Sequence, residues 1–192
     1  MKSIYVYMRM KNQHILKLND RKKEKGMATK IWLVIPCYNE QEILNHTIEC
    51  LDKKMQQLID GGIISADSRM VFVDDGSLDE TWNIITMASR NNDKVVGLKL
   101  AHNKGHQNAL LAGMMYVKDK CDCMISMDAD LQDDIDVMEQ FVEKYNKGAQ
   151  IVYGIRKDRQ TDRRFKRATA NLFYKLMKVL GAETINNHED YR

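Results

Sequence analysis

The sequence predicts an α/β domain in which a mostly parallel sheet is covered by helices on both faces. Short apolar runs alternate along the chain with segments of helical periodicity, and several of these runs have no polar side. Such runs are typical of strands in a sheet that is covered on two sides. The alternation itself favours parallel strands joined by helical crossovers. The length of 192 residues, 44% hydrophobic and 30% charged, suits one globular domain.

Five apolar runs, most of them rich in Val and Ile, are expected to form the strands. They comprise residues 31–35, 70–73, 95–100, 123–127 and 151–153. We expect the first strand to end before Pro36, the only proline of the chain, because proline lacks the backbone N–H that a sheet uses.

Four segments between these runs predict helices. The first has apolar residues three or four positions apart, which places them on one helical face: Leu44, Ile48, Leu51, Met55 and Leu58. The second follows residues 77–80, whose Ser-Leu-Asp-Glu sequence has the pattern of a capping box. Residues 106–118 and 134–146 predict the other two, and Asp133 and Asp134 would then cap the last helix.

Basic residues are concentrated in two segments, although the formal net charge of the chain is only +3. Residues 1–30 and residues 156–178 are strongly basic, so the rest of the chain is acidic. An acidic body favours a cation site, and the second basic segment favours an anionic partner. We expect residues 1–28 to be a poorly ordered N-terminal extension and residues 29–160 to form the core. Residues 161–192 would contain a basic amphipathic helix.

Several function classes lack their sequence signals. The four cysteines show no paired spacing and no histidine at zinc-ligand spacing, which favours reduced thiols of a cytosolic protein. We expect neither a secretory signal nor, with no apolar run of roughly 18 residues, a membrane span. The glycine patterns of P-loops and dinucleotide-binding turns are absent. Nucleic-acid binding is not expected, because no known nucleic-acid-binding module accompanies the basic stretches.

Polar residues directly follow four of the expected strands. They occur as PCYNE (36–40), DDGS (74–77), HNKGHQNA (102–109) and DADLQ (128–132). Ligands of open α/β sheets bind beyond the carboxyl ends of the parallel strands. Each segment alone could be ordinary turn or capping sequence. Four of them at one edge of a sheet predict a binding site.

Asp128 and Asp130 are separated by one residue, so their side chains would point to the same side if strand geometry continues. Two carboxylates at one place suit a hard divalent cation, Mg²⁺ or Mn²⁺, which keeps positions open for water and substrate phosphates. No cluster of His or Cys accompanies them, which argues against zinc. Asp74 and Asp75 could accept hydrogen bonds from a ribose or a base, or could form only a turn.

The motifs, taken in order, resemble those of a known enzyme family. They are VIPCYNE, VDDGSLDET, HNKGHQNALLAGM, MDADLQDD, YGIR and NHEDYR, and they cover about residues 30–192. The set resembles the family-2 inverting glycosyltransferases of GT-A fold, which use nucleotide-diphospho sugars. Within that family it is most similar to the polyprenyl-phosphate branch, with the dolichol-phosphate mannosyltransferases and the bactoprenol (undecaprenyl-phosphate) glucosyltransferases.

The resemblance implies a role for each matching residue. The residues that would line the nucleotide pocket are Pro36, Tyr38, Glu40, Asp74 and Asp75. The residues that would handle ribose, diphosphate and the metal are Asp128, Asp130 and Gln132. The arginines that would hold the lipid phosphate are Arg156 and either Arg163 or Arg164. Asp190 would act as the base or orient the sugar.

The resemblance also implies a reaction and its setting. A sugar would pass from a UDP- or GDP-sugar to an undecaprenyl or dolichyl phosphate, with Mg²⁺ or Mn²⁺, at the cytoplasmic face of a membrane. Members of this branch continue past DYR, so we expect the chain to be truncated at Arg192 and the membrane contact to involve residues missing here. A soluble member acting on a polysaccharide, and a nucleotide-binding module without turnover, are the alternatives. The oligomeric state stays open.

The basic segment over residues 163–180 carries apolar residues at helical spacing. It could be an ordinary amphipathic helix packed on the domain, or an interfacial helix on anionic lipid. The sequence leaves both interpretations open.

Overall fold

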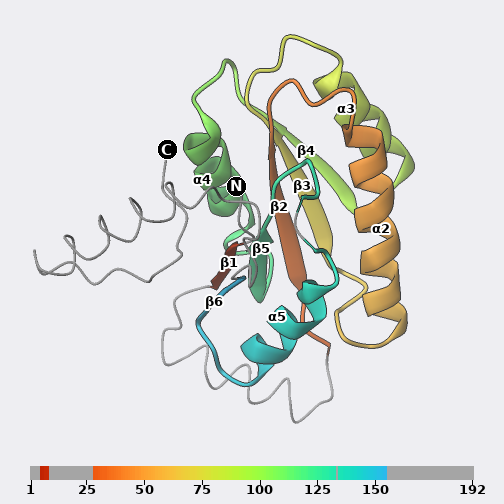
Figure 1. Cartoon of the computed structure of the whole chain (residues 1–192), viewed down its shortest axis with the longest axis vertical. Coiled ribbons are helices and arrows are strands. Elements are labelled where there is room, and N and C mark those ends of the chain that lie inside the picture. The colour runs from red at the N-terminus through yellow and green to blue at the C-terminus, as the bar shows by residue number, and fades with distance from the viewer. Residues whose placement is uncertain (1–4, 9–27, 133, 155–192) are drawn as a thin grey trace, which may run out of the picture. The chain divides into compact units, whose positions relative to one another are not determined.

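The computed structural model describes residues 5–8, 28–132 and 134–154, and these contain one sheet of six strands (Figure 1). In spatial order the strands are β4 (Val95–Lys99), β3 (Arg69–Asp74), β2 (Ile31–Cys37), β5 (Cys123–Ser126), β1 (Tyr5–Met8) and β6 (Ile151–Tyr153). The first four are parallel to one another, whereas β1 is antiparallel to both β5 and β6. The predicted mostly parallel sheet is confirmed.

Helices cover both faces of this sheet. They are α2 (Leu44–Asp60), α3 (Thr81–Asn91), α4 (His106–Val117) and α5 (Val137–Asn146). Side chains of β2 alternate between two apolar clusters, because successive residues of a strand point to opposite faces. Leu33 packs in the cluster that α2, α3 and α5 cover, and Val34 packs in the cluster that α4 covers. The predicted α/β class with helices on both faces is therefore confirmed.

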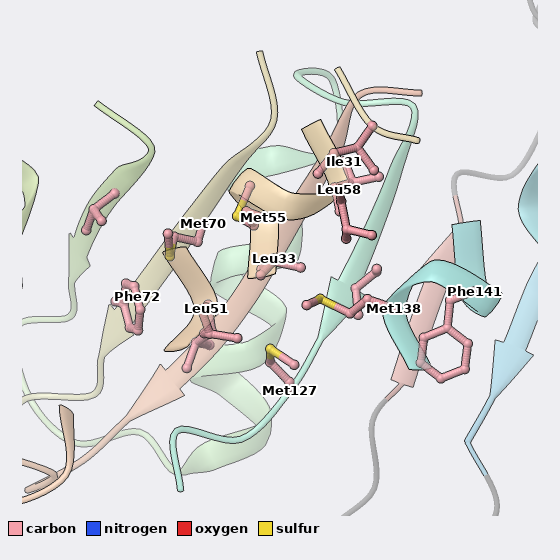
Figure 2. Packing of buried hydrophobic residues seen from close by; sticks show 14 of the residues in the cluster. Ile31, Leu33, Leu51, Met55, Leu58, Met70, Phe72, Met127, Met138 and Phe141 are labelled. Carbon is pink, nitrogen blue, oxygen red and sulfur yellow. The ribbon is translucent and has the colours of Figure 1, made fainter. Parts of the chain in front are cut away.

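The larger cluster holds α2 and α5 against the sheet (Figure 2). Leu51, Met55 and Leu58 lie along one face of α2 and are buried toward β2, as their spacing predicts. Met127, directly after β5, and Met138 on α5 belong to the same cluster. This cluster includes Met127 and Ala129, on either side of Asp128, so the start of the loop after β5 is anchored in the core.

Pro36 does not end the first strand, so that prediction is wrong. β2 continues to Cys37, and Pro36 is paired with Val73 of β3. Val34 accepts a hydrogen bond from Met127 N–H, so the backbone groups of Val34, and two residues later of Pro36, face β5. The β2–β5 ladder ends at Val34, and the missing N–H of Pro36 therefore breaks no ladder bond.

The capping-box prediction for α3 is also wrong. The helix begins at Thr81, and Glu80 in the N-cap position makes no side-chain capping bond. Ser77 Oγ instead accepts the N–H of Asn39, and the Glu80 carboxylate accepts a bond from Asn83 Nδ2. The hydroxyl of Ser77 thus binds a backbone group of a distant loop instead of capping the helix.

The last predicted helix begins three residues late. α5 starts at Val137, and Asp134 Oδ1 accepts the N–H of Asp136, in a turn that precedes the helix. Asp136 occupies the N-cap position without a side-chain bond, so the capping role assigned to Asp134 is wrong. Asp133 lies outside the described residues.

The N-terminal segment, expected to be a poorly ordered extension, contributes one short strand. Tyr5–Met8 form β1, in register with both β5 and β6. A run of four residues beside many basic ones is a weak signal for a strand, so the local sequence did not predict this one. The described residues 5–153 belong to one compact unit. The predicted boundary at residue 160 falls outside the described part of the chain.

Candidate functional site

Four loops follow the carboxyl ends of the parallel strands β2, β3, β4 and β5, at one edge of the sheet. Backbone hydrogen bonds join neighbouring strands at this edge. Asp75 N–H donates to Cys37 O at 2.9 Å, and Leu100 N–H donates to Asp74 O at 2.9 Å. The sequence prediction that these polar segments share an edge is confirmed by this topology.

The β2–α2 and β3–α3 loops are joined by reciprocal hydrogen bonds. Asn39 N–H donates to Ser77 Oγ at 3.0 Å, and Leu78 N–H donates back to Asn39 Oδ1 at 2.9 Å. Asn39 has a φ of 55°, a left-handed conformation in which Asn is enriched. Glu40 N–H donates to Thr81 Oγ1 at 2.8 Å. The backbone of Glu40 is thereby held against the start of α3.

Asp79 strengthens the same connection. Its carboxylate accepts the N–H of Thr81 at 3.0 Å and that of Gln41 at 3.2 Å. Burial alone would raise the pKa of Asp79, but the hydroxyl of Thr81 and these backbone donors lower it below its usual value. The ionised carboxylate is therefore the form that joins the two loops.

Asp75 holds the β4–α4 loop. Its carboxylate accepts two backbone N–H bonds, from Lys104 at 2.7 Å and from Gly105 at 2.8 Å, and the residue is 2% exposed. Gly76 has a φ of 70°, and a Cβ there would lie 2.6 Å from the backbone N of Asn103. Only glycine permits this approach without displacing the backbone of the neighbouring loop.

Asp74 is fully buried beneath these loops. Its Oδ1 accepts the N–H of Ser77 at 3.1 Å. Its Oδ2 has no hydrogen-bond partner among the described residues, and Lys99 Nζ lies 3.6 Å away. Burial raises the pKa of the nearby Cys37 thiol well above its usual value, and the carboxylates of Glu40 and Asp74 add to the effect.

Asp128 and Asp130 lie in the loop after β5 and are less buried than Asp74 and Asp75. The strand ends at Ser126, so strand alternation no longer determines where these two carboxylates point. Asp128 Oδ1 lies 3.8 Å from His106 Nε2, an ion pair when the imidazole is protonated. Asp130 Oδ1 accepts the N–H of Gln132 at 3.3 Å. The Asp128 side chain is 14% exposed.

His106 is a neighbour of this site that sequence reasoning did not single out. It is the first residue of α4, and its side chain is about half exposed. The only sequence signal was its position within HNKGHQNA, one of the four polar segments. Its contact with Asp128 could not be predicted, since 22 positions separate them along the chain.

Asp128, Asp130 and Gln132 are the candidate ligands for a divalent cation. The described residues contain no group of three or more His, Cys, Asp or Glu that could hold a metal. Mg²⁺ in phosphate-transfer sites typically uses one or two carboxylates and takes its other ligands from water and substrate phosphates. Asp128 and Asp130 provide carboxylates of this kind, and the exposed Gln132 provides an amide oxygen. These residues fit such a cation.

The remaining predicted site residues divide into two groups. Pro36 is buried in β2, whereas the ring of Tyr38 is 41% exposed and Glu40 is half-buried. Four predicted residues lie outside the described part of the chain: Arg156, Arg163, Arg164 and Asp190. In the described residues, no helix is long and apolar enough to cross a membrane.

Comparison with known protein families identifies the class of this protein. The family model "Glycosyl transferase family 2" matches residues 32–190, which is most of the chain. The protein belongs to this family and is a family-2 glycosyltransferase. The resemblance drawn from the ordered motifs is confirmed.

Curated relatives agree with the family assignment. The chain is 52% identical over 160 residues to an uncharacterized glycosyltransferase, YkoT, of Bacillus subtilis (strain 168), covering 83% of this chain and 48% of that protein. It is 37% identical over 164 residues to the prophage bactoprenol glucosyl transferase homolog of Escherichia coli (strain K12), covering 85% and 51%. The bactoprenol glucosyl transferase of Shigella phage SfV matches with the same identity and coverage. The chain spans about half the length of these relatives.

Among solved structures, S. aureus TarS is similar with a TM-score of 0.46 and 17% identity, over 60% of this chain and 20% of that chain. A second TarS structure, of residues 1–349, has a TM-score of 0.42 and 21% identity, over 53% and 27%.

Proposed function

We propose that this glycosyltransferase moves a sugar from a nucleotide-diphospho sugar to a polyprenyl phosphate, with inversion and with Mg²⁺ or Mn²⁺. The observation that carries the proposal is the acidic loop after β5, which lies at the same sheet edge as three joined loops, in a family-2 chain. Identity of 37% to proteins named bactoprenol glucosyl transferases supports the polyprenyl acceptor.

The nucleotide would bind over the β2–α2 and β3–α3 loops. The exposed ring of Tyr38 offers a surface for a base to stack on, and Glu40 lies two residues further on. Pro36, Asp74 and Asp75 would form the floor of this pocket. Support for the two aspartates comes from their hydrogen bonds, which hold the surrounding loops in one arrangement. A pocket that is formed before binding loses less entropy when the nucleotide enters.

Asp128 and Asp130, with Gln132 beside them, would hold the cation at the diphosphate. When bound, the cation supplies electrostatic stabilisation of the negative charge that develops on the leaving diphosphate. Asp130 would align the diphosphate of the donor beside the cation, and Asp128 would also contact the ribose. His106 Nε2 lies 3.8 Å from that carboxylate, at the edge of the proposed cation site.

In the proposed reaction an oxygen of the lipid phosphate attacks the anomeric carbon. The new carbon–oxygen bond forms as the bond to the nucleoside diphosphate breaks, and the diphosphate leaves with the electron pair. A phosphate monoester has its second pKa near 6 and is already largely anionic at pH 7, so it needs no strong general base. Asp190 would assist by orienting the sugar. Arg156, with Arg163 or Arg164, would hold the acceptor phosphate.

The proposed acceptor places the reaction at the cytoplasmic face of a membrane. Residues 163–180 would either pack on the domain or lie on anionic lipid. Flotation with liposomes that contain or lack anionic lipid separates these, because only an interfacial helix responds to lipid charge.

Titration calorimetry followed by a transfer assay tests the proposal. UDP and GDP are titrated with and without Mn²⁺, and a panel of nucleotide sugars is then incubated with undecaprenyl phosphate. We expect binding that depends on the cation, followed by formation of lipid-linked sugar. Absence of cation-dependent binding would overturn the proposed site. Transfer to a polysaccharide but not to the lipid would show that the acceptor is a polysaccharide.

A nucleotide-binding module without turnover is the alternative that the same experiment tests. Cation-dependent binding without transfer or donor hydrolysis would favour this function over the first.

A further inference from the structure

Thr47 is a buried polar residue on the apolar face of α2. It is 1% exposed, and the other buried residues of this helix are Leu44, Leu51, Met55 and Leu58. A hydroxyl removed from water destabilises the folded state unless it forms a hydrogen bond. The position therefore calls for a specific partner.

That partner is the loop after β5. Thr47 Oγ1 lies 2.5 Å from Ala129 O and 3.2 Å from Ile43 O. A hydroxyl has only one proton to donate, so it can form one strong hydrogen bond to these two carbonyls. The shorter contact is consequently the principal bond, and it joins two segments that are 82 positions apart.

Ala129 is the residue between the two carboxylates of the candidate cation site. It is 3% exposed, and its carbonyl precedes the backbone of Asp130. The loop has left the strand at Ser126, and Leu131 has a left-handed φ of 48°. A bond to the Ala129 carbonyl therefore constrains the orientation of the peptide that joins Ala129 to Asp130.

α2 is itself tied to the proposed nucleotide loops. Leu44 N–H donates to Glu40 O at 3.0 Å, and Glu40 N–H donates to Thr81 Oγ1 at 2.8 Å. Through the first turns of α2, Thr47 connects the acidic loop to the β2–α2 and β3–α3 loops.

We propose that Thr47 is a positioning residue, which orients Asp128 and Asp130 for the cation through its bond to Ala129. The proposal rests on the proposed function and adds to it a residue that lies outside all of the sequence motifs.

Three variants and a control separate the hydroxyl from the side-chain volume. Thr47→Val keeps the shape and removes the donor, Thr47→Ser keeps the donor, and Thr47→Ala removes the donor without placing a methyl group against the carbonyl. The control is Thr86→Val on α3, because Thr86 Oγ1 donates to Trp82 O at 2.9 Å within its own helix. The control loses the same kind of bond without touching the acidic loop.

The first measurement is UDP binding by calorimetry with and without Mn²⁺. We expect Thr47→Val to weaken the Mn²⁺-dependent binding about tenfold, the effect of one lost buried hydrogen bond. Metal-free UDP binding should be unchanged, and Thr47→Ser and Thr86→Val should bind as the parent protein does. A purely structural role would weaken both forms of binding equally, and that result would overturn the proposal.

The second measurement needs no ligand. Amide hydrogen exchange at residues 128–132 should be faster in Thr47→Val and unchanged in Thr47→Ser and Thr86→Val. If the parent protein binds no UDP, the proposed function fails, but this exchange still decides the role of Thr47. Exchange equal to that of the parent would overturn the proposal. If Thr47→Val does not fold, Thr47→Ala is measured in both experiments with the same expectations.

Discussion

Two pairs of aspartates lie at the carboxyl ends of β3 and β5, the strands on either side of β2, and the two pairs differ in burial. Asp74, the last residue of β3, and Asp75, which follows it, are buried, and their carboxylates accept backbone N–H bonds from the loops around them. Asp128 and Asp130, after β5, are only half-buried. In sequence both pairs are acidic residues after an apolar strand. The buried first pair is suited to shaping the site, and the more exposed second pair is suited to contacting a ligand.

The largest expected effect is on transfer, in a variant of the second pair. Asp130→Ala should lower transfer at least about a hundredfold, because it removes a group proposed to stabilise the transition state through the cation. The free energy of unfolding should change by less than about 0.5 kcal/mol, since the side chain is half-buried. Transfer kinetics and urea denaturation measure the two quantities.

Asp190→Asn is the matched comparison for that variant, and it should leave measurable transfer. Equal losses in Asp130→Ala and Asp190→Asn would contradict the view that electrostatics outweighs base catalysis.

The next effect is on stability, next to the first pair. Gly76→Ala should lower the free energy of unfolding by about 3 kcal/mol, because its Cβ would meet the backbone of His102 and Asn103 at a positive φ. Gly62→Ala is the control, since Gly62 has a φ of 67° and a Cβ there would meet nothing within 4 Å. It should lose only about 1 kcal/mol. Equal losses in urea denaturation would show that the two loops are not in close contact.

Asp75→Asn should lower the free energy of unfolding by about 2 kcal/mol. The variant weakens two charge-assisted bonds from Lys104 and Gly105, and places an amide N–H₂ near these donors. Thermal unfolding measures the loss, and amide exchange at residues 102–105 shows whether the loop loosens. If Asp75→Asn lowered the free energy of unfolding no more than Asp130→Ala does, the proposed difference between the two aspartate pairs would be wrong.

The smallest effect is a loss of stability in alkali. Burial raises the pKa of the Cys37 thiol, which lies beside the first pair, and burial likewise raises that of Cys123. The folded state therefore keeps these protons after the unfolded state has released them. Stability is complete below the unfolded pKa and falls as the pH rises through it, by about 1 kcal/mol at pH 9 for both thiols together.

Urea denaturation at pH 7 and pH 9 measures this effect, and Cys37→Ala should remove about half of it. An unchanged pH dependence in that variant would show that Cys37 titrates normally. Cys50, which is only half-buried, provides the control variant Cys50→Ala.

The local sequence determined the fold class and the place of the site. Apolar runs and helical spacings depend on residues close together along the chain, so β2, β3, β4 and β5 and the spacing on α2 were predictable. Parallel strands bring their carboxyl ends to one edge, and the four polar segments were therefore predicted to share it. The ordered motifs were sufficient for the family.

Only the tertiary structure decided which of these residues are buried and what each one contacts. Pro36 continues its strand because β5 has already ended beside it, and Ser77 binds Asn39 instead of capping α3. Asp74 and Asp75 became buried, and Thr47 reached Ala129, through partners far away in sequence. A hydrogen bond between distant segments depends on how whole elements pack, and no local pattern of residues encodes that packing.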